Sequence, residues 1–297
     1  MTQPNPSHVR AGVLAARVLN EACKEVKPGV KVSTICSLAE RRTIELGARP
    51  AFPCNVSVQH IAAHYTSPKS DTSVIPESGL VKVDVGAQID GYIADTARTV
   101  DLDGTLEGLV VATDDALNEA IAVMVPGNTL GEVGRTIEKV IRAYGIVPVK
   151  ELSGHSMLQY KLHAGKRVPN VHTHDSTPIE VGECYAIEPF ATSGIGIVDS
   201  KNTYIFSNTD VDRPLSGVTE KLRLHLRKKY GPFPFASRWV GTSDRSISVE
   251  AEFNALLHAK AIRPHPVLVE KKGRPVSQSE HTVFITEEGP RILTKAG

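Results

Sequence analysis

Residues 81–100 read VKVDVGAQIDGYIADTARTV, a pattern that predicts two β-strands joined by a tight turn. Asp90 and Gly91 are residue types that two-residue hairpin turns favour. Each predicted strand carries one aspartate among apolar residues, Asp84 in the first strand and Asp95 in the second. Aspartate is depleted in strands, and a buried carboxylate is costly unless it is paired or bound. A binding partner must therefore offset the energetic cost of burying these two carboxylates.

The turn determines which face of the hairpin each aspartate occupies. With Asp90 and Gly91 at the centre of the turn, Asp84 lies opposite Ala97. Asp95 is two places from Ala97, so it is the diagonal neighbour of Asp84 on the same face, roughly 7–8 Å away at the backbone. Two aspartates in this arrangement can hold a metal ion between them. An odd-length loop would place them on opposite faces, and two solvent-facing aspartates on an edge strand remain the alternative interpretation of the pair alone.

Length and composition indicate an ordinary globular protein. The 297 residues suffice for one large domain or for a domain with an insertion, and the net charge of +1 gives no general attraction to nucleic acid or to an anionic membrane. No apolar run approaches the roughly 20 residues of a membrane span. The N-terminal MTQPNPSHVRAG lacks the features of a secretory signal. The 4 cysteines are far apart, so we expect free thiols and a cytoplasmic location.

The spacing of apolar residues predicts a mixture of helices and strands. Helices are predicted over residues 7–26, 33–46, 106–125, 130–144, 218–231 and 246–262. Strands are predicted over residues 51–58, 80–88 and 92–101, in short pieces between 146 and 206, from 267 onward, and as a hairpin over 281–294. Residues near 200–265 therefore form a predicted helical insertion in an α+β domain.

The first predicted helix has Ser7 as its candidate N-cap. The face that we expect to be buried carries Val9, Val13, Ala16, Leu19 and Cys23.

Three further stretches place chemically active side chains at strand-like positions. LSGHSMLQYKLHAG contains His155 and His163, ECYAIEPFAT contains Glu188, and SQSEHTVFIT contains Glu280. Each stretch is weak evidence by itself, because histidines are often simply packed or exposed. Their combination with the aspartates of the hairpin is more informative, since all are carboxylates or imidazoles with apolar neighbours.

Five motifs in this order resemble a type II methionine aminopeptidase, and the chain is most similar to the archaeal form without the N-terminal extension of the eukaryotic enzymes. The motifs are FPCNVSVQHIAAHYTS, VKVDVGAQIDGYIADTARTV, LSGHSMLQYKLHAG, CYAIEPFAT and SEHTVFIT. The resemblance implies the α+β pita-bread fold, a curved antiparallel sheet backed by helices with internal pseudo-twofold symmetry. It places the catalytic domain at residues 1–199 and 266–297 and a type II helical insertion at 200–265.

The resemblance also implies two adjacent divalent metal ions, Co, Mn, Fe or Zn. Their ligands would be Asp84, Asp95, His155, Glu188 and Glu280. Asp95 and Glu280 would bridge the ions, Asp84 would complete one, and His155 with Glu188 the other. Four carboxylates balance two divalent charges, and oxygen-rich ligation with one imidazole suits these metals. Without metal the carboxylates would repel one another, so we expect a loosened site.

The substrate residues follow from the same motifs. The resemblance implies that His64 contacts the scissile amide nitrogen and that His163 stabilises the developing oxyanion. Glu188 would also act as the general base on a water that bridges the metals and attacks the first peptide bond. His174 is expected at the mouth of the site, with His172 left on the surface.

Three residues match the family's pocket walls for the methionine side chain: Phe52, Leu162 and Phe190. His265 stands where the resemblance implies a tyrosine, which changes the expected width of the pocket. Ser279 replaces a bulkier residue and is expected to loosen the same wall.

The resulting hypothesis is a cytoplasmic, monomeric enzyme that removes the initiator methionine from nascent chains whose second residue is small. It needs neither nucleic acid nor a membrane, and ribosome docking is an expectation from the family's biology. An Xaa-Pro aminopeptidase or prolidase is the nearest alternative, although those usually carry a large N-terminal domain. The roughly 60-residue insertion disfavours a type I enzyme. A catalytically inactive relative could use the basic run KLRLHLRKKYG to bind nucleic acid or ribosomes. Such a relative should have lost metal ligands, whereas this chain keeps all five implied ligands and both implied substrate histidines.

Overall fold

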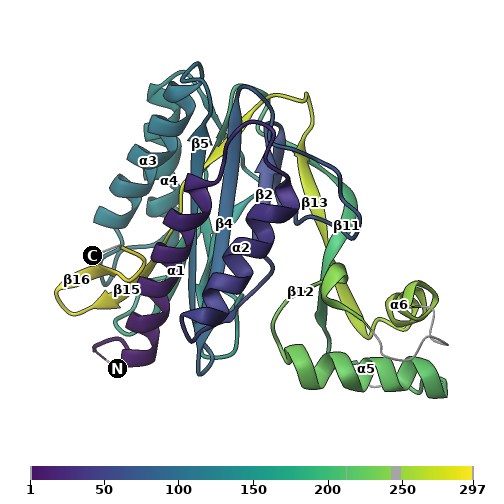
Figure 1. The fold of residues 1–297 in the computed structure, drawn as a ribbon. Helices are drawn as coiled ribbons and strands as arrows, with labels where there is room; N and C mark the ends of the chain where they lie inside the picture. Colours follow the sequence, from purple (N-terminus) through teal and green to yellow (C-terminus); the bar gives the residue numbers. More distant parts are fainter. Residues whose placement is uncertain (1, 212, 242–248, 296–297) are drawn as a thin grey trace.

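The computed structural model describes residues 2–211, 213–241 and 249–295. Curved antiparallel sheets form the centre, helices cover their outer faces, and a small helical lobe lies at one end (Figure 1). The helices are α1 (Pro6–Lys24), α2 (Val32–Glu45), α3 (Glu107–Ala122), α4 (Leu130–Ala143), α5 (Gly217–Tyr230) and α6 (Val249–His258). Within the described ranges, no helix combines the length and the apolar character needed to cross a membrane.

The hairpin forms with the predicted register. Strand β4 (Leu80–Ile89) pairs with β5 (Tyr92–Asp101), and Asp84 lies opposite Ala97. Asp90 and Gly91 have φ values of 53° and 82°, so both occupy the left-handed region that a type I′ turn requires. Asp95 is only 4% exposed, so the alternative of solvent-facing aspartates is wrong.

The strand predicted over residues 51–58 is broken in two. Strands β1 (Arg49–Pro50) and β2 (Asn55–Val58) both pair with β4, and the segment between them is irregular. Pro50 and Pro53 explain the break, because proline cannot donate to a strand ladder. The irregular segment brings Phe52 to the inner face of the sheet.

Helix α1 differs from its prediction in its cap and in its buried face. Asn5, and not Ser7, caps the helix, because Asn5 Oδ1 accepts a hydrogen bond of 2.9 Å from the Ser7 amide. Val13 is 45% exposed, whereas the buried residues are mostly small: Ala11, Gly12, Ala15, Ala16 and Ala22 among them. A Cβ at Gly12 would lie 2.3 Å from the Leu293 carbonyl oxygen. Close approach to the sheet therefore selects small residues over large apolar ones.

The second half of the molecule is built on a five-stranded sheet. Its strand order is β16 (Gly289–Ile292), β15 (His281–Thr286), β9 (Cys184–Ile187), β7 (Ser153–Met157) and β8 (Arg167–Pro169). The predicted C-terminal hairpin is confirmed, with Val283 opposite Ile292. A three-stranded sheet of β14 (Val276–Gln278), β10 (Phe190–Thr192) and β6 (Val147–Pro148) adjoins it.

The helical lobe has a hydrophobic core of its own. Strands β11 (Val198–Asn208) and β13 (Ile262–Glu270) lead into and out of it, with β12 (Phe235–Ala236) and β3 (Ile61–Ala63) at the edges of the same sheet. The core includes Phe206, Leu226, Phe235, Phe253 and Leu256. The strand expected from residue 267 already begins at Ile262, and residues 246–248 of the helix predicted over 246–262 lie outside the described residues.

Candidate metal centre and substrate cavity

Three carboxylates converge on one point of the inner face of the sheet. Ligand oxygens of Asp84, Asp95 and Glu280 lie within 4.8 Å of one another. The hairpin register supplies the first two, and hydrogen bonds to β5 place the third. The Glu280 amide donates to the Ala97 carbonyl at 3.1 Å, and the Thr96 hydroxyl donates to the Glu280 carbonyl at 2.9 Å. These backbone contacts fix Glu280 beside the hairpin although it lies far along the chain.

His155 and Glu188 reach the same point from the other half of the molecule. His155 Nε2 is 3.6 Å from Asp95 Oδ2 and 3.7 Å from Glu188 Oε1. His155 lies on β7 opposite Ala186 of β9, and Glu188 directly follows β9. The structure therefore brings all five predicted ligands into one cavity.

Burial dominates the electrostatics of this cluster. It raises the pKa of Asp84, Glu188 and Glu280 well above the usual range, and carboxylate neighbours add to the effect. Burial raises the pKa of Asp95 to about 7 and lowers that of His155 to about 3. Asp84 Oδ1 is buried without a hydrogen-bond partner. Four crowded carboxylates, one neutral imidazole and an orphaned oxygen are a donor set that fits divalent first-row metals.

Two further histidines complete the polar part of the cavity. His64 Nδ1 lies 3.1 Å from the Pro266 carbonyl oxygen, which can only accept, so Nδ1 carries the proton and Nε2 is left as an acceptor. Burial lowers the pKa of His64. The His163 ring stands 4.3 Å from the His155 ring, and burial lowers the pKa of His163 to about 4. His64 and His163 are therefore both neutral near pH 7.

The apolar wall depends on a glycine in β4. Phe52 and Leu162 line the cavity as predicted. Gly86 lies opposite Asp95, and a Cβ there would be 2.2 Å from Phe52 Cε1. An interior glycine in a strand often marks such a close approach. Gly86 thus lets the Phe52 ring pack directly beside the carboxylates.

His265 also lines the cavity, as predicted. Its Nε2 lies 3.0 Å from Ser207 Oγ, and its ring meets the His64 ring edge to face at 6.3 Å. Burial, followed by the neighbouring His64 and His163, lowers the pKa of His265 to about 4. An uncharged polar ring therefore occupies this wall.

Two predicted substrate residues lie elsewhere. Phe190 is buried in a separate cluster with Ala62 and Val149 and does not line the cavity. Phe190 lies on β10, where it is paired with Gln278 of β14. His174 is exposed on a loop, where its ring contacts that of His172 at 5.4 Å.

Sequence reasoning missed three residues that line the cavity, namely Asn55, Ile205 and Pro234. Asn55 could have been found, because it pairs with Asp84 once β2 is placed beside β4. Ile205 and Pro234 come from the flank and the interior of the insertion. Nothing in their local sequence indicated a position near the metal ligands.

The loop that carries Leu162 and His163 is anchored on the hairpin turn. The Tyr160 amide donates to the Gly91 carbonyl at 2.8 Å, and Gln159 Nε2 donates to the Asp90 carbonyl at 2.8 Å. A Cβ at Gly91 would lie 2.5 Å from the Tyr160 ring. The turn that sets the register of the aspartates therefore also positions this substrate loop.

Comparison with known proteins identifies the family. The model of metallopeptidase family M24 matches residues 7–287. The chain belongs to metallopeptidase family M24. A methionine aminopeptidase of Methanocaldococcus jannaschii is 42% identical over 288 residues, which is 97% of each chain. The M24 assignment agrees with the clustered carboxylates and histidine described above.

Solved structures confirm the pita-bread fold of this M24 chain. A thermophilic Arx1 superposes with a TM-score of 0.86 at 20% identity, over 97% of this chain and 89% of that one. A methionine aminopeptidase of Thermotoga maritima superposes with a TM-score of 0.71 at 24% identity, over 99% and 100%. At these identities the likeness concerns the fold alone.

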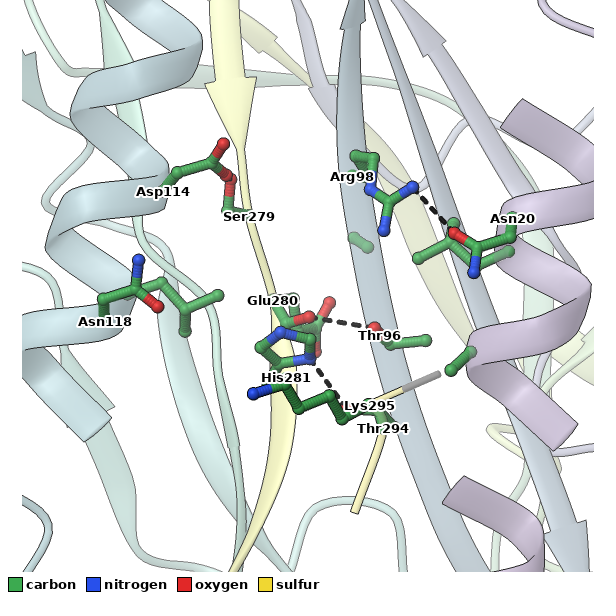
Figure 2. A pocket seen from close by; sticks show the side chains of 14 residues that line it. Asn20, Thr96, Arg98, Asp114, Asn118, Ser279, Glu280, His281, Thr294 and Lys295 are labelled. Carbon is green, nitrogen blue, oxygen red and sulfur yellow. Dashed lines mark hydrogen bonds between the residues drawn. The ribbon is translucent and has the colours of Figure 1, made fainter. Parts of the chain in front are cut away.

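A larger cavity of about 410 Å³ lies on the outer face of this M24 fold, between α1 and α3. Ser279 lines this cavity and not the substrate wall, and its side chain lies against Asp114 of α3 (Figure 2). The Ser279 hydroxyl is hydrogen-bonded to Asp114 and to Thr113 of the same helix. The expectation that Ser279 loosens the methionine pocket is therefore wrong. Side chains alternate along an extended chain, so the residue before Glu280 faces away from the metal site.

Proposed function

We propose that this chain is a methionine aminopeptidase of the type II form, which removes the N-terminal methionine when the second residue is small. The observation that carries the proposal is the convergence of five metal-type ligands and two neutral histidines in one cavity with an apolar wall. Relatives at 38–42% identity over nearly the full length are methionine aminopeptidases. The helical lobe between Glu188 and Glu280 supports the type II form, with the insertion at residues 200–265 and the catalytic domain at 1–199 and 266–297.

Two divalent ions would be held by the five converging residues. Asp95 lies close to Asp84 and Glu280 on one side and 3.6 Å from His155 on the other, so it would be a central member of the ligand set. When bound, the metals (Mn, Fe, Co or Zn) supply Lewis acidity and offset the charge of the carboxylates.

The protein's own residues would perform the remaining steps. Glu188 accepts a proton from the attacking water and passes it to the departing amine. His64 Nε2, which is an acceptor because Nδ1 is bonded to Pro266, receives the amide N–H of the scissile bond. His163 donates an N–H to the carbonyl oxygen as negative charge develops there. A neutral imidazole with a pKa of about 4 is suited to this role because it carries no charge to bury.

The methionine side chain would lie between Phe52 and Leu162, with His265 on the opposite wall. The unbranched thioether fits a narrow apolar slot, while the His265 ring adds one polar contact. Phe190 would act only indirectly, by packing behind the site, and His174 would contact longer substrates at the surface.

The partners would be the N-termini of nascent chains in the cytoplasm, and the enzyme would act as a monomer. The free thiols of all four cysteines fit a reducing compartment. Docking on the ribosome through α5 would involve the exposed Lys221, Lys228 and Lys229. Arg223 and Arg227 of the same run form hydrogen bonds within the lobe: Arg223 donates to the Arg213 carbonyl and Arg227 to the Thr209 carbonyl. The basic run is therefore a smaller surface than its sequence suggests, which weakens the alternative of a nucleic-acid-binding protein.

Peptide hydrolysis tests the proposal directly. Metal-free protein is reconstituted with Mn, Fe, Co or Zn and assayed on Met-Ala-Ser, Leu-Ala-Ser and an Ala-Pro peptide. We expect cleavage of Met-Ala-Ser only, and only after addition of metal. Equal cleavage of Leu-Ala-Ser would refute methionine specificity, cleavage of the Ala-Pro peptide would favour a prolidase-type enzyme, and activity without metal would refute the two-metal site.

A further inference from the structure

Arg238 and Glu40 form a nearly buried ion pair that joins the insertion to helix α2. Their side chains are 14% and 12% exposed. Arg238 lies in a short 3₁₀ turn (Ser237–Trp239) of the insertion, and Glu40 lies in α2. The next residue, Trp239, donates its indole N–H to the other Glu40 oxygen at 2.8 Å. A single carboxylate thus receives two adjacent side chains of the insertion.

The ion pair is part of a closed ring of hydrogen bonds. Glu40 Oε1 accepts from the Cys54 amide at 3.2 Å as well as from Arg238. Arg238 Nη1 donates to the Thr66 hydroxyl at 2.6 Å and to the Ser67 carbonyl at 3.0 Å. The Thr66 hydroxyl closes the ring by donating to the Cys54 carbonyl at 2.8 Å. Cys54, Thr66 and Ser67 are buried, so no water can replace a lost partner without rearrangement.

The ring braces the two chain segments that form one wall of the substrate cavity. Cys54 lies between the wall residues Phe52 and Asn55, and Thr66 follows His64 by two residues. The same two segments are also joined by the bond from the Val56 amide to the Tyr65 carbonyl at 2.8 Å. His64 itself adopts a φ of 64°, which for a residue other than glycine requires support from its surroundings.

We propose that Arg238 is a positioning residue: through its ring with Glu40, Thr66 and Cys54, the insertion holds Phe52 and His64 at the spacing that the substrate needs. The inference rests on the proposed aminopeptidase function for its kinetic part only. It assigns Arg238 a part in substrate binding although Arg238 does not line the cavity. Trp239 links this ring of hydrogen bonds to the lobe, because the Trp239 indole stacks on the Tyr230 side chain at the end of α5 with centroids 5.9 Å apart.

Four variants separate positioning from stability. Arg238→Gln opens the ring, and Arg238→Lys keeps the charge opposite Glu40 but cannot reach Glu40, Thr66 and Ser67 with one ammonium. Trp239→Phe removes one bond to Glu40 and leaves the ring closed. Phe253→Ala weakens the core of the lobe without touching the ring. Each is compared with wild type for Tm, bound metal, and KM and kcat on Met-Ala-Ser.

We expect Arg238→Gln to raise KM about tenfold or more with bound metal unchanged, since small misplacements of binding groups have large kinetic effects. Arg238→Lys should show an intermediate KM, whereas Trp239→Phe and Phe253→Ala should lower Tm with KM within about twofold of wild type. If KM instead follows Tm across all four variants, Arg238 is merely structural and the proposal is wrong.

Hydrogen exchange supplies a readout that does not depend on activity. The Cys54 and Val56 amides should exchange about tenfold faster in Arg238→Gln than in Phe253→Ala. Unchanged protection of both amides would overturn the proposal even if KM rises. If wild type fails to cleave Met-Ala-Ser, the proposed function is wrong, and the exchange experiment still decides whether the ring braces the wall.

Discussion

The two halves of the cavity are built in different ways. The metal half, Asp84, Asp95, His155, Glu188 and Glu280, lies on or directly beside strands that pair through their backbones. In the substrate half, Phe52, His64 and His163 lie on irregular segments, while His265 lies on β13. Backbone ladders set the first half by register alone. The second half depends on individual side-chain bonds between segments far apart in the chain, such as the bond from His64 to Pro266.

This difference predicts how the halves fail. Loss of a group in the metal half should abolish metal binding and turnover together, because the remaining ligands are fixed and cannot move to compensate. Loss of a group in the substrate half should leave the metal bound and change only the kinetics.

The largest expected effect comes from Asp95→Asn, which removes a negative charge from the carboxylate cluster but keeps the shape of the side chain. We expect loss of bound metal and a fall in kcat/KM of at least about 10³-fold. Metal analysis and hydrolysis of Met-Ala-Ser measure the two effects. Asp210→Asn, at an exposed position in the insertion, is the matched control and should change neither. Normal metal content in Asp95→Asn would contradict the assignment of Asp95 as a ligand.

The same substitution should stabilise the metal-free protein at high pH. Burial raises the pKa of Asp95 from its ordinary 3.8 to about 7, so the folded state binds this proton more tightly than the unfolded state does. Its contribution to stability is present below about pH 4 and is lost as the pH rises through 7, by about 4 kcal/mol in total. Asp95→Asn does not titrate, and it also removes a charge that raises the pKa of Asp84, Glu188 and Glu280, which acts in the same direction.

Denaturant unfolding of the two metal-free proteins at pH 4, 6 and 8 measures this difference. The free energy of unfolding of Asp95→Asn, relative to that of wild type, should increase from pH 4 to pH 6 and again to pH 8. A stability difference that is the same at all three pH values would mean that the carboxylate cluster is not strained in the absence of metal.

In the substrate half, His163→Ala should lower kcat by about 10²–10³-fold, the usual cost of removing one oxyanion donor. Bound metal should remain near the wild-type level, because His163 lies beside the His155 ring and is outside the proposed ligand set. His172→Ala, on an exposed loop, is the control. Loss of metal from His163→Ala would mean that His163 is a metal ligand and belongs to the metal half.

The smallest effect is expected from Gly86→Ala, at the border between the halves. The new methyl group must displace the Phe52 ring, which lies 2.2 Å from the position of the Cβ. We expect a loss of about 1–3 kcal/mol in the free energy of unfolding and a higher KM, with metal content unchanged. Gly108→Ala in α3, where a Cβ meets no atom within 4 Å, should be neutral or slightly stabilising. A changed metal content in Gly86→Ala would show that the halves are not independent.

The same division explains what could be predicted from the sequence. Asp84 and Asp95 were placed correctly because a two-residue turn and the period of a strand determine their face. The position of His265 in the cavity followed from the resemblance, but its bond to Ser207 did not, because that bond depends on the pairing of β11 with β13. Phe190 was misplaced because closeness in sequence to Glu188 says nothing about the direction in which β10 leaves the site.

The prediction of which face of α1 is buried was wrong for a related reason. Hydrophobicity favoured Val13, whereas the helix approaches the sheet so closely that alanine and glycine fill the contact. Packing distance is a property of two elements together and cannot be obtained from the apolar pattern of one.

The anchoring of the Tyr160 loop on the Asp90–Gly91 turn limits how this enzyme can diversify. One residue inserted in the turn would reverse the face of one aspartate and, in the same event, remove the support of Leu162 and His163. Hydrolytic chemistry and this side of the pocket are therefore inherited as a unit. Ile205, Pro234 and His265 lie on the insertion and its flanking strands, outside that unit. New substrate preferences can arise there, by evolution or by engineering, while the reaction itself is preserved.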